Sequence, residues 1–348
     1  MASLSNPKYS VALVHQSSTE KSTSTQVTTT TTTTKYELTG ALTSLTLDEP
    51  ENGIAQKVSI RLAQATYEGT DIVKLINEHD IIYVYADTGD GPVEVFRGYI
   101  WTKKYSMSDE KEITLTCYDH LIYLQESEEY QYFSSGKSTS AIFSTLCGNK
   151  GIPLKYNYES ITHGKVVIRG TLADAFTTDL IDNVRKKKGK RGVIRATKGT
   201  MEVFTEGTPN KTVYKFTKGK DGNIIKSEHE ITLDGLTTKV IILGSEKDDK
   251  AAPIKATVTG KTSKYGTIQK IISSTDSDKL ATLKEEANQI IKDNGDPKKY
   301  VTVSAVDNPW VRKGDLIYLD DGYVKGNGVV KGVSHDGLKK VMSMEVRM

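Results

Sequence analysis

The end of the chain repeats a passage near its start. The segment from Asp80 reads DIIYVYADTGDGPVEVFRGYIWTKKYSMSDEKEITLTC, and the segment from Asp315 reads DLIYLDDGYVKGNGVVKGVSHDGLKKVMSMEV. Both contain an Asp, aliphatic residues around a Tyr, an Asp/Gly turn, a Gly that opens a strand (Gly98 and Gly328), a second Asp turn and a closing alternating strand. The order of features is the same, and the loop lengths differ. Duplication doubles a shape and supplies no chemistry, so this pattern favours an assembly protein over a catalyst.

Composition limits the classes of protein that remain. The chain has 348 residues, of which 36% are hydrophobic and 26% charged, which is enough for two or three cores. The 47 Lys and Arg residues nearly balance the 44 Asp and Glu residues, so charge alone attracts neither nucleic acid nor membrane. No apolar run approaches a membrane span, and the start does not resemble a secretory signal. We expect synthesis and folding in the cytoplasm and no membrane insertion by this chain.

The first third predicts an arm followed by a small barrel. Residues 1–34 hold a Ser/Thr-rich tract that ends in seven threonines. Because a possible strand precedes the tract and another follows it, we expect an extended hairpin or arm that docks on a neighbouring molecule, with plain disorder as the alternative. Residues 35–125 contain short alternating segments separated by the turns TGDG and MSDE, which is typical of antiparallel strands in a barrel or sandwich. We assign this range to a first β-barrel domain.

The rest of the chain mixes helices with strands. Residues 126–245 contain two helical patterns and a meander, which predict an α/β insert domain. One pattern starts at Ser138, a candidate N-cap, and the other runs from Thr171 into lysines that suit a helix C-terminus. Residues 246–348 contain one helix and the second repeat copy, which predicts a second β-barrel domain. The expected fold class is therefore α+β and β-dominant, with two similar small barrels and an insert between them.

No group of residues predicts catalysis. No nucleophile elbow, Walker loop or dinucleotide-binding glycine motif occurs. The carboxylate doublets Glu128-Glu129, Asp248-Asp249 and Asp320-Asp321 lie in polar, turn-like surroundings and are expected to be solvated. The histidines are scattered without metal-ligand spacing; they are His15, His79, His120, His163, His229 and His335. We assign no catalytic, cofactor-binding or metal-binding residue and expect no cofactor.

Four smaller features are each expected to be structural. Asp119-His120 and His335-Asp336 could suggest acid/base pairs, but both are expected to start turns or helices. The basic run 185–191 is either a nucleic-acid contact or a solvated helix C-terminus capped by Gly189, and we favour the helix end because no aromatic residues accompany it. The two cysteines predict buried thiols, because Cys117 lies in a strand pattern and Cys147 in a helix pattern. Trp101 and Trp310 are expected to fill a core or an interface rather than stack on a ligand.

Several sequence blocks together resemble a known family. The strings GKSTSAIFSTLCGNKGIP, THGKVVIRGTLADAFTTDLIDN, SKYGTIQKI, VRKGDLIYL and GVVKGVSHDGLKKVMSMEV occur in the order seen in XkdQ/YqbQ-type tail proteins of myophages, defective prophages and phage-tail-like bacteriocins. The resemblance runs from about Tyr36 to Met348, and this family is similar to the broader baseplate hub proteins of contractile tails. The Thr-rich arm departs from the pattern of the family.

The resemblance implies a structural role. It implies a homotrimer with two barrels per chain, so that a quasi-sixfold ring joins the tail tube protein to the central spike protein. Other baseplate proteins and LysM-type tail proteins would be neighbours, the location would be a phage tail or a released bacteriocin particle, and no specific nucleic acid would be bound. The alternatives are a tail-associated enzyme that degrades cell walls and a carbohydrate-binding β module.

Overall fold

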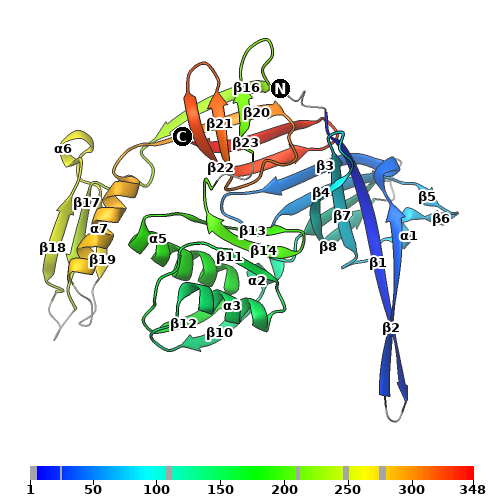
Figure 1. Cartoon of the computed structure of the whole chain (residues 1–348), viewed down its shortest axis with the longest axis horizontal. Coiled ribbons are helices and arrows are strands. Elements are labelled where there is room, and N and C mark those ends of the chain that lie inside the picture. The colour runs from blue at the N-terminus through cyan, green and yellow to red at the C-terminus, as the bar shows by residue number, and fades with distance from the viewer. Residues whose placement is uncertain (1–5, 24–25, 107–111, 209–211, 246–250, 274–279) are drawn as a thin grey trace.

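The computed structural model describes residues 6–23, 26–106, 112–208, 212–245, 251–273 and 280–348, and strands dominate it (Figure 1). The expected β-dominant α+β fold class is confirmed. The strands are β1 (Lys8–Thr23), β2 (Gln26–Glu37), β3 (Leu42–Glu49), β4 (Lys57–Ala63), β5 (Thr66–Tyr67), β6 (Thr70–Asp71), β7 (Ile81–Asp87), β8 (Val93–Tyr105), β9 (Glu112–Tyr118), β10 (Glu128–Phe133), β11 (Leu154–Asn157), β12 (Val166–Thr171), β13 (Gly192–Thr197), β14 (Thr200–Thr205), β15 (Tyr214–Thr217), β16 (Ile224–Thr232), β17 (Lys239–Leu243), β18 (Ile254–Thr259), β19 (Gln269–Ser273), β20 (Lys298–Val306), β21 (Leu316–Asp320), β22 (Lys325–Asp336) and β23 (Val341–Arg347). The helical segments are η1 (Thr39–Ala41), α1 (Ile72–Leu75), α2 (Ile122–Glu126), α3 (Thr139–Asn149), α4 (Leu172–Asp174), η2 (Ala175–Ile181), α5 (Asp182–Lys188), α6 (Thr262–Tyr265) and α7 (Leu280–Asn294).

One large sheet contains both copies of the repeat. Its strands follow the order β16-β20-β23-β22-β3-β4-β9-β8-β7-β1-β2, and β21 and β15 branch from β22. The N-terminal unit consists of β3, β4, β9, β8 and β7 with β1, and the C-terminal unit consists of β16, β20, β23, β22 and β21 with β15. Each unit has its own hydrophobic core. Among the described residues, no strand pairing closes either unit into a barrel.

Five strands of each unit follow the same order, and their register matches around the repeated glycine, whereas β1 pairs antiparallel with β7 and β15 pairs parallel with β21. Ile82 pairs with Gly98 in the N-terminal unit, and Ile317 pairs with Gly328 in the C-terminal unit. A β-bulge follows at the same place in both, after Ile100 and after Val330. The expectation that the two isoleucines and the two glycines lie on equivalent strands is confirmed. The repeat in the sequence is therefore a repeat of strand pairing.

Backbone geometry explains which residues the two copies share. A Cβ at Gly98 would lie 2.2 Å from the Tyr118 carbonyl oxygen, and a Cβ at Gly328 would lie 2.4 Å from a methyl group of Val346. Each glycine thus lets one strand cross closely over the last strand of its unit. The carboxylate of Asp80 accepts a hydrogen bond from the Asn77 amide at 2.8 Å, and the carboxylate of Asp315 accepts one from the amide three residues before it at 2.9 Å. These Asp side chains hold the same turn before each repeat.

The middle domain, residues 121–206, lies below the large sheet in Figure 1. It contains the two-stranded sheet β10-β12 and the three-stranded sheet β11-β14-β13. The predicted helix at Ser138 is α3, because the Ser138 hydroxyl accepts a hydrogen bond from the Ala141 amide. The second predicted helix forms as α4, η2 and α5, and Gly189 ends it in a left-handed conformation. Ile54 and Ala55, from the loop after β3, also pack into the core of this domain.

The strand pairing moves the expected boundary at residue 245. β15 and β16 belong to the C-terminal unit, since they pair with β21 and β20. Residues 237–294 form a separate small domain, in which α7 packs on the sheet β18-β17-β19 around Val240, Ile242 and Leu283. The insert expected over 126–245 therefore includes strands of the C-terminal unit. The barrel expected over 246–348 includes most of the small domain. The small domain interrupts the C-terminal unit between β16 and β20, which separates β15 and β16 from the other strands of that unit in the sequence.

The expected arm, residues 1–34, is only partly an arm. β1 and β2 form a long antiparallel hairpin, as predicted, and the hairpin extends away from the rest of the chain in Figure 1. However, the segment from Lys8 to Val14 also pairs with β7, and Tyr9, Val11 and Leu13 are buried in the core of the N-terminal unit. The arm proper is therefore the two-stranded ribbon beyond Val14. None of the helices described is long and apolar enough to cross a membrane.

Candidate functional site: the seam between the two units

The seam is the short antiparallel pairing between β3 of the N-terminal unit and β22 of the C-terminal unit. It runs from the pair Val333 and Glu49 to the pair Asp336 and Thr46. β22 is long enough to pair with β21 near its start and with β3 near its end. The two repeat copies are thus joined through the main chain into one continuous sheet.

A buried carboxylate anchors one end of the seam. Glu49 is only 4% exposed. Its Oε1 accepts a hydrogen bond from Arg312 Nη2, and its Oε2 accepts one from the Lys313 amide at 3.0 Å. Burial alone would raise the pKa of Glu49, but the Arg312 guanidinium outweighs burial and lowers that pKa to about 2. Glu49 is therefore held as an anion between the units.

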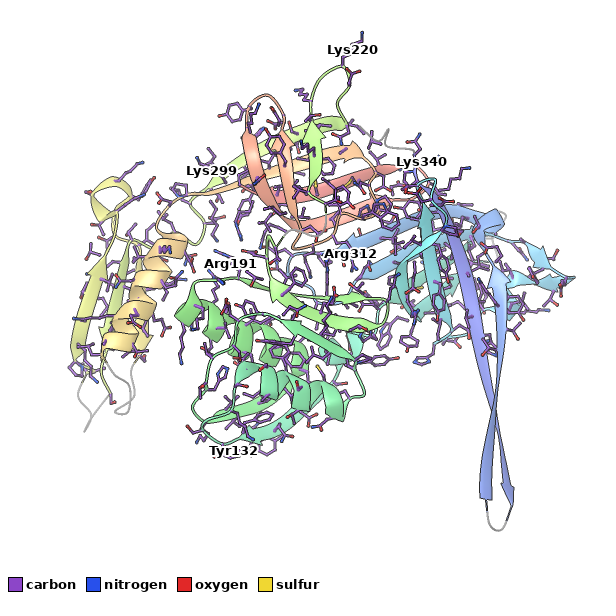
Figure 2. The ribbon with its side chains drawn as sticks, viewed as in Figure 1. Tyr132, Arg191, Lys220, Lys299, Arg312 and Lys340 are labelled. Carbon is purple, nitrogen blue, oxygen red and sulfur yellow. The ribbon has the colours of Figure 1, made fainter. Side chains whose placement is uncertain are left out.

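The same cluster fastens the middle domain to the seam. Arg195 of β13 donates to the Asp315 carboxylate at 2.8 Å and to the Lys313 carbonyl at 3.1 Å. Arg312 donates to the Ala196 carbonyl at 2.9 Å, and Figure 2 shows Arg312 where the two units approach the middle domain. Removing one partner of a buried pair of this kind costs about 3–5 kcal/mol, because the other charge is left without compensation. The cluster therefore fixes three parts of the chain relative to one another.

A second buried cluster lies at the other end of the seam. Asp307, which follows β20, accepts a hydrogen bond from the Tyr9 hydroxyl at 2.6 Å, and its other oxygen lies 2.6 Å from His335 Nδ1. His335 Nε2 lies 3.0 Å from the Val311 carbonyl oxygen. Burial and the neighbouring Asp307 carboxylate raise the pKa of Tyr9. Tyr9 comes from the N-terminal unit and the other residues from the C-terminal unit, so this cluster also links the two copies.

The aspartates of the two Asp/His dipeptides have similar roles, but the histidines do not. Asp119 accepts from the Leu121 amide at 2.8 Å at the start of α2, and Asp336 accepts from the Lys339 amide at 2.9 Å, which confirms turn and helix-start roles for both. Asp119 also accepts from the Gln56 amide at 2.9 Å, and burial raises its pKa to about 7. His335 is not a turn residue, because it is buried against Asp307. Sequence spacing did not indicate that contact.

His120 lies beside a cavity of about 490 Å³ between the N-terminal unit and the middle domain. Arg97, Tyr99, Tyr123 and Lys150 also line this cavity. Burial, assisted by the nearby Arg97, lowers the pKa of His120. Within the described residues, no group of three or more His, Cys, Asp or Glu side chains could hold a metal ion.

The carboxylate doublets do not converge. Glu129 pairs with Lys150 at 3.0 Å, and Asp320 pairs with Lys325 at 3.0 Å. Asp321 is buried rather than solvated. Its carboxylate accepts hydrogen bonds from two backbone amides of the β21–β22 turn and lies 2.7 Å from His229. Asp248-Asp249 lies outside the described residues.

The basic run is a helix end that contacts acidic residues. Arg185 pairs with Asp293 of α7 at 3.1 Å, and Lys186 pairs with Glu286 of the same helix at 3.3 Å. Gly189, with a φ of 68°, closes the helix as predicted. The sequence indicated the helix end but not its partner, since α7 follows about a hundred residues later. The run holds the small domain against the middle domain.

The two cysteines and Trp310 lie in or against a core, as expected, whereas Trp101 lies on the surface. Cys117 in β9 and Cys147 in α3 are free and buried, and burial raises the pKa of both thiols. Trp310 packs against the core of the N-terminal unit. Trp101 on β8 is 39% exposed and packs edge-on against Tyr118 and Tyr123.

The chain resembles known proteins over most of its length. A family model described as YqbQ-like matches residues 24–348. The phage-like element PBSX protein XkdQ of Bacillus subtilis is 23% identical over 314 residues, which cover 84% of this chain and 92% of that protein. A tail protein of Neisseria meningitidis has a similar fold, with a TM-score of 0.67, 14% identity, and coverage of 98% of this chain and 97% of that one. The 43 kDa tail protein of prophage MuSo2 from Shewanella oneidensis has a TM-score of 0.66 and 13% identity, with coverage of 97% and 98%.

Proposed function

We propose that this chain, which belongs to the YqbQ-like family, is a structural hub protein in the baseplate of a contractile phage tail or an R-type bacteriocin. Three copies would form a ring of six similar units, which joins the tail tube to the central spike. Other baseplate and LysM-type tail proteins would surround the ring. The particle is the site of action, and the chain acts by recognition rather than catalysis.

The observation that carries the proposal is the matched register of the two units. One chain contains two units with the same strand order, the same bulge and the same close glycine crossing. Three such chains supply six near-equivalent units, so a threefold assembly can meet a sixfold tube on one side and a threefold spike on the other. The tail proteins with similar folds support the same setting.

The interactions of the buried charges at the seam support a structural role. The buried charges at the seam all have partners from other segments of the chain, and they serve to join domains. We therefore expect no hydrolysis of peptidoglycan by the purified chain and no specific binding of nucleic acid.

Mass measurement of the assembled chain, followed by electron microscopy of tail particles, tests the proposal. We expect a trimer in the particle, located between the tube and the spike. Hydrolysis of cell-wall material by the purified chain would instead favour the enzyme. A monomer that is thermally stabilised by oligosaccharides would favour the carbohydrate-binding module.

A further inference from the structure

We infer that β16 of one copy pairs with the end of β8 of the next copy, in the register that β3 and β22 adopt inside one chain. This inference rests on the proposed ring. It names the contact that would close the ring, the register of the pairing and the residues that lie opposite each other. In particular, Lys104 of one copy would lie opposite Glu230 of the next.

β16 occupies in the C-terminal unit the place that β3 occupies in the N-terminal unit. β3 pairs with β4, and a bulge separates the pairs at Leu42 and Ser44. β16 pairs with β20, and a bulge separates the pairs at Ile224 and Lys226. Both strands then run on without interruption along partners that occupy the same place in each unit. On this register, Glu49 of β3 corresponds to Ile231 of β16.

β8 occupies in the N-terminal unit the place that β22 occupies in the C-terminal unit. Beyond the shared bulge, Lys103 pairs with Leu115 in the N-terminal unit, and Val333 pairs with Met344 in the C-terminal unit. In the C-terminal unit, the free side of this stretch is where β3 pairs to form the seam. Lys103 of β8 thus corresponds to Val333, and the two residues after it correspond to the two residues after Val333.

In the described part of the chain, β16 and the end of β8 each have an edge without a partner strand. Among the described residues, β16 pairs only with β20, and no strand pairs with the outer side of β8 beyond Tyr99. The two stretches cannot meet within one chain, because six strands of the sheet lie between β16 and β8. An unpaired strand edge is a template for pairing with another chain. The chain therefore forms one seam internally, between β3 and β22. On β16 and β8 it carries the two strand edges that would form a second seam.

Exposed apolar side chains gather on these two edges. Trp101 is 39% exposed and Tyr105 is 54% exposed on β8, while Ile231 is 65% exposed and Leu233, just beyond β16, is 53% exposed. Exposed apolar residues that gather along one strand edge of a soluble chain indicate a surface that another molecule covers. A second copy of this chain explains why both edges carry them.

The register of the seam places complementary groups together. Inside the chain, Ser334 pairs with Asp48, and the same step between copies puts Lys104 opposite Glu230. Opposite charges across an antiparallel pair are favourable. One residue further along, Tyr105 would pair with His229, as His335 pairs with Leu47 inside the chain.

Where the side chains of the two seams differ, both members of a contact differ in a compatible way. Inside the chain, Lys331 contacts Glu51 at 2.7 Å. Trp101 and Leu233 occupy the equivalent positions between copies. Two apolar side chains therefore replace the two members of the ion pair. Likewise, the pair Arg312 and Glu49 is replaced by Asn77 and Ile231, so neither side leaves a buried charge without a partner.

Disulfide trapping tests the register. The double variant Lys104→Cys with Glu230→Cys places two thiols on directly opposed residues, within reach of a disulfide. The native cysteines are buried and should not compete. Mild oxidation of the assembled trimer, taken from tail particles if the purified chain is monomeric, should give a covalent band at three times the mass of the chain. Neither single variant should give this band.

A register control uses Lys104→Cys with Lys226→Cys. Residue 226 lies four residues from 230 along the same strand, roughly 13 Å away, and should not cross-link. The charge reversals Lys104→Glu and Glu230→Lys give a second readout. Each should weaken trimer formation roughly tenfold, because three interfaces each lose a favourable pair, and the double reversal should restore it.

The outcomes separate this inference from the proposed function. A trimer that forms normally but cross-links only in the register control, or not at all, overturns the β16–β8 pairing and leaves the ring intact. A chain that is not trimeric in the particle overturns the ring itself. Cross-linked trimers in the predicted register support both.

Discussion

Replacing Glu49 by Gln should destabilise the joint between the two units by about 3 kcal/mol at neutral pH. The carboxylate is buried, and its pKa falls from an ordinary 4.5 to about 2, mainly because Arg312 outweighs the effect of burial. At about 1.4 kcal/mol per pH unit, this fall corresponds to about 3 kcal/mol in favour of the charged form. That value agrees with the cost of about 3–5 kcal/mol for breaking a buried ion pair.

The pH dependence of this effect has a definite sign. Because the folded-state pKa lies below the unfolded one, the stabilisation by Glu49 is complete above about pH 4.5 and is lost as the pH falls through about 2. The difference in unfolding free energy between the native chain and the Glu49→Gln variant should therefore be constant near neutrality and should shrink in acid. Urea unfolding of both proteins at a series of pH values measures this difference.

Asp48→Asn is the matched control. Asp48 precedes Glu49 on the same strand, but its side chain lies on the opposite, less buried face. Its substitution should change the unfolding free energy by no more than about 0.5 kcal/mol. Equal stability of the Glu49→Gln variant and the native chain at pH 7 would refute the claim that this carboxylate joins the units.

Three other changes have defined outcomes. Gly98→Ala should lower the unfolding free energy by about 2 kcal/mol or more, because the new Cβ would meet the Tyr118 carbonyl. Gly40→Ala, which has open space around the new Cβ, should be tolerated, and equal melting temperatures of the two variants would contradict this. The contribution of Asp119 to stability should decline as the pH rises from about 4 to about 7, because its folded-state pKa is raised, and Asp119→Asn should flatten that slope in urea titrations; an unchanged slope would contradict it. Replacing the ribbon 16–33 with a short turn should preserve the fold by circular dichroism but reduce incorporation into particles, since an isolated two-stranded ribbon is marginally stable and needs a surface to dock on; unchanged incorporation would make it dispensable.

The repeat itself was predictable because short-range chemistry determines it. The Asp before each repeat, the glycine at each close crossing and the alternating apolar residues act on neighbouring strands, so each copy carries them in its own sequence. The same holds for α3, whose cap Ser138 lies next to the helix it starts. Local signals of this kind can be read without a structure.

The seam was not predictable because its contacts span nearly the whole chain. Glu49 and Arg312 are 263 residues apart in the sequence, and Tyr9 and Asp307 are 298 residues apart. Nothing near Glu49 indicates which cation will reach it. The first strands of the C-terminal unit were missed for a related reason, since an inserted domain separates β16 from β20 and interrupts the repeat.

The rotational symmetry of the hub within an intact tail particle tests the central claim most directly. We expect a cryo-electron microscopy map with three copies of this chain, in which the N-terminal and C-terminal units alternate around one ring of six similar densities. A ring built from six copies, or one in which the two units lie at different heights and radii, would contradict the account.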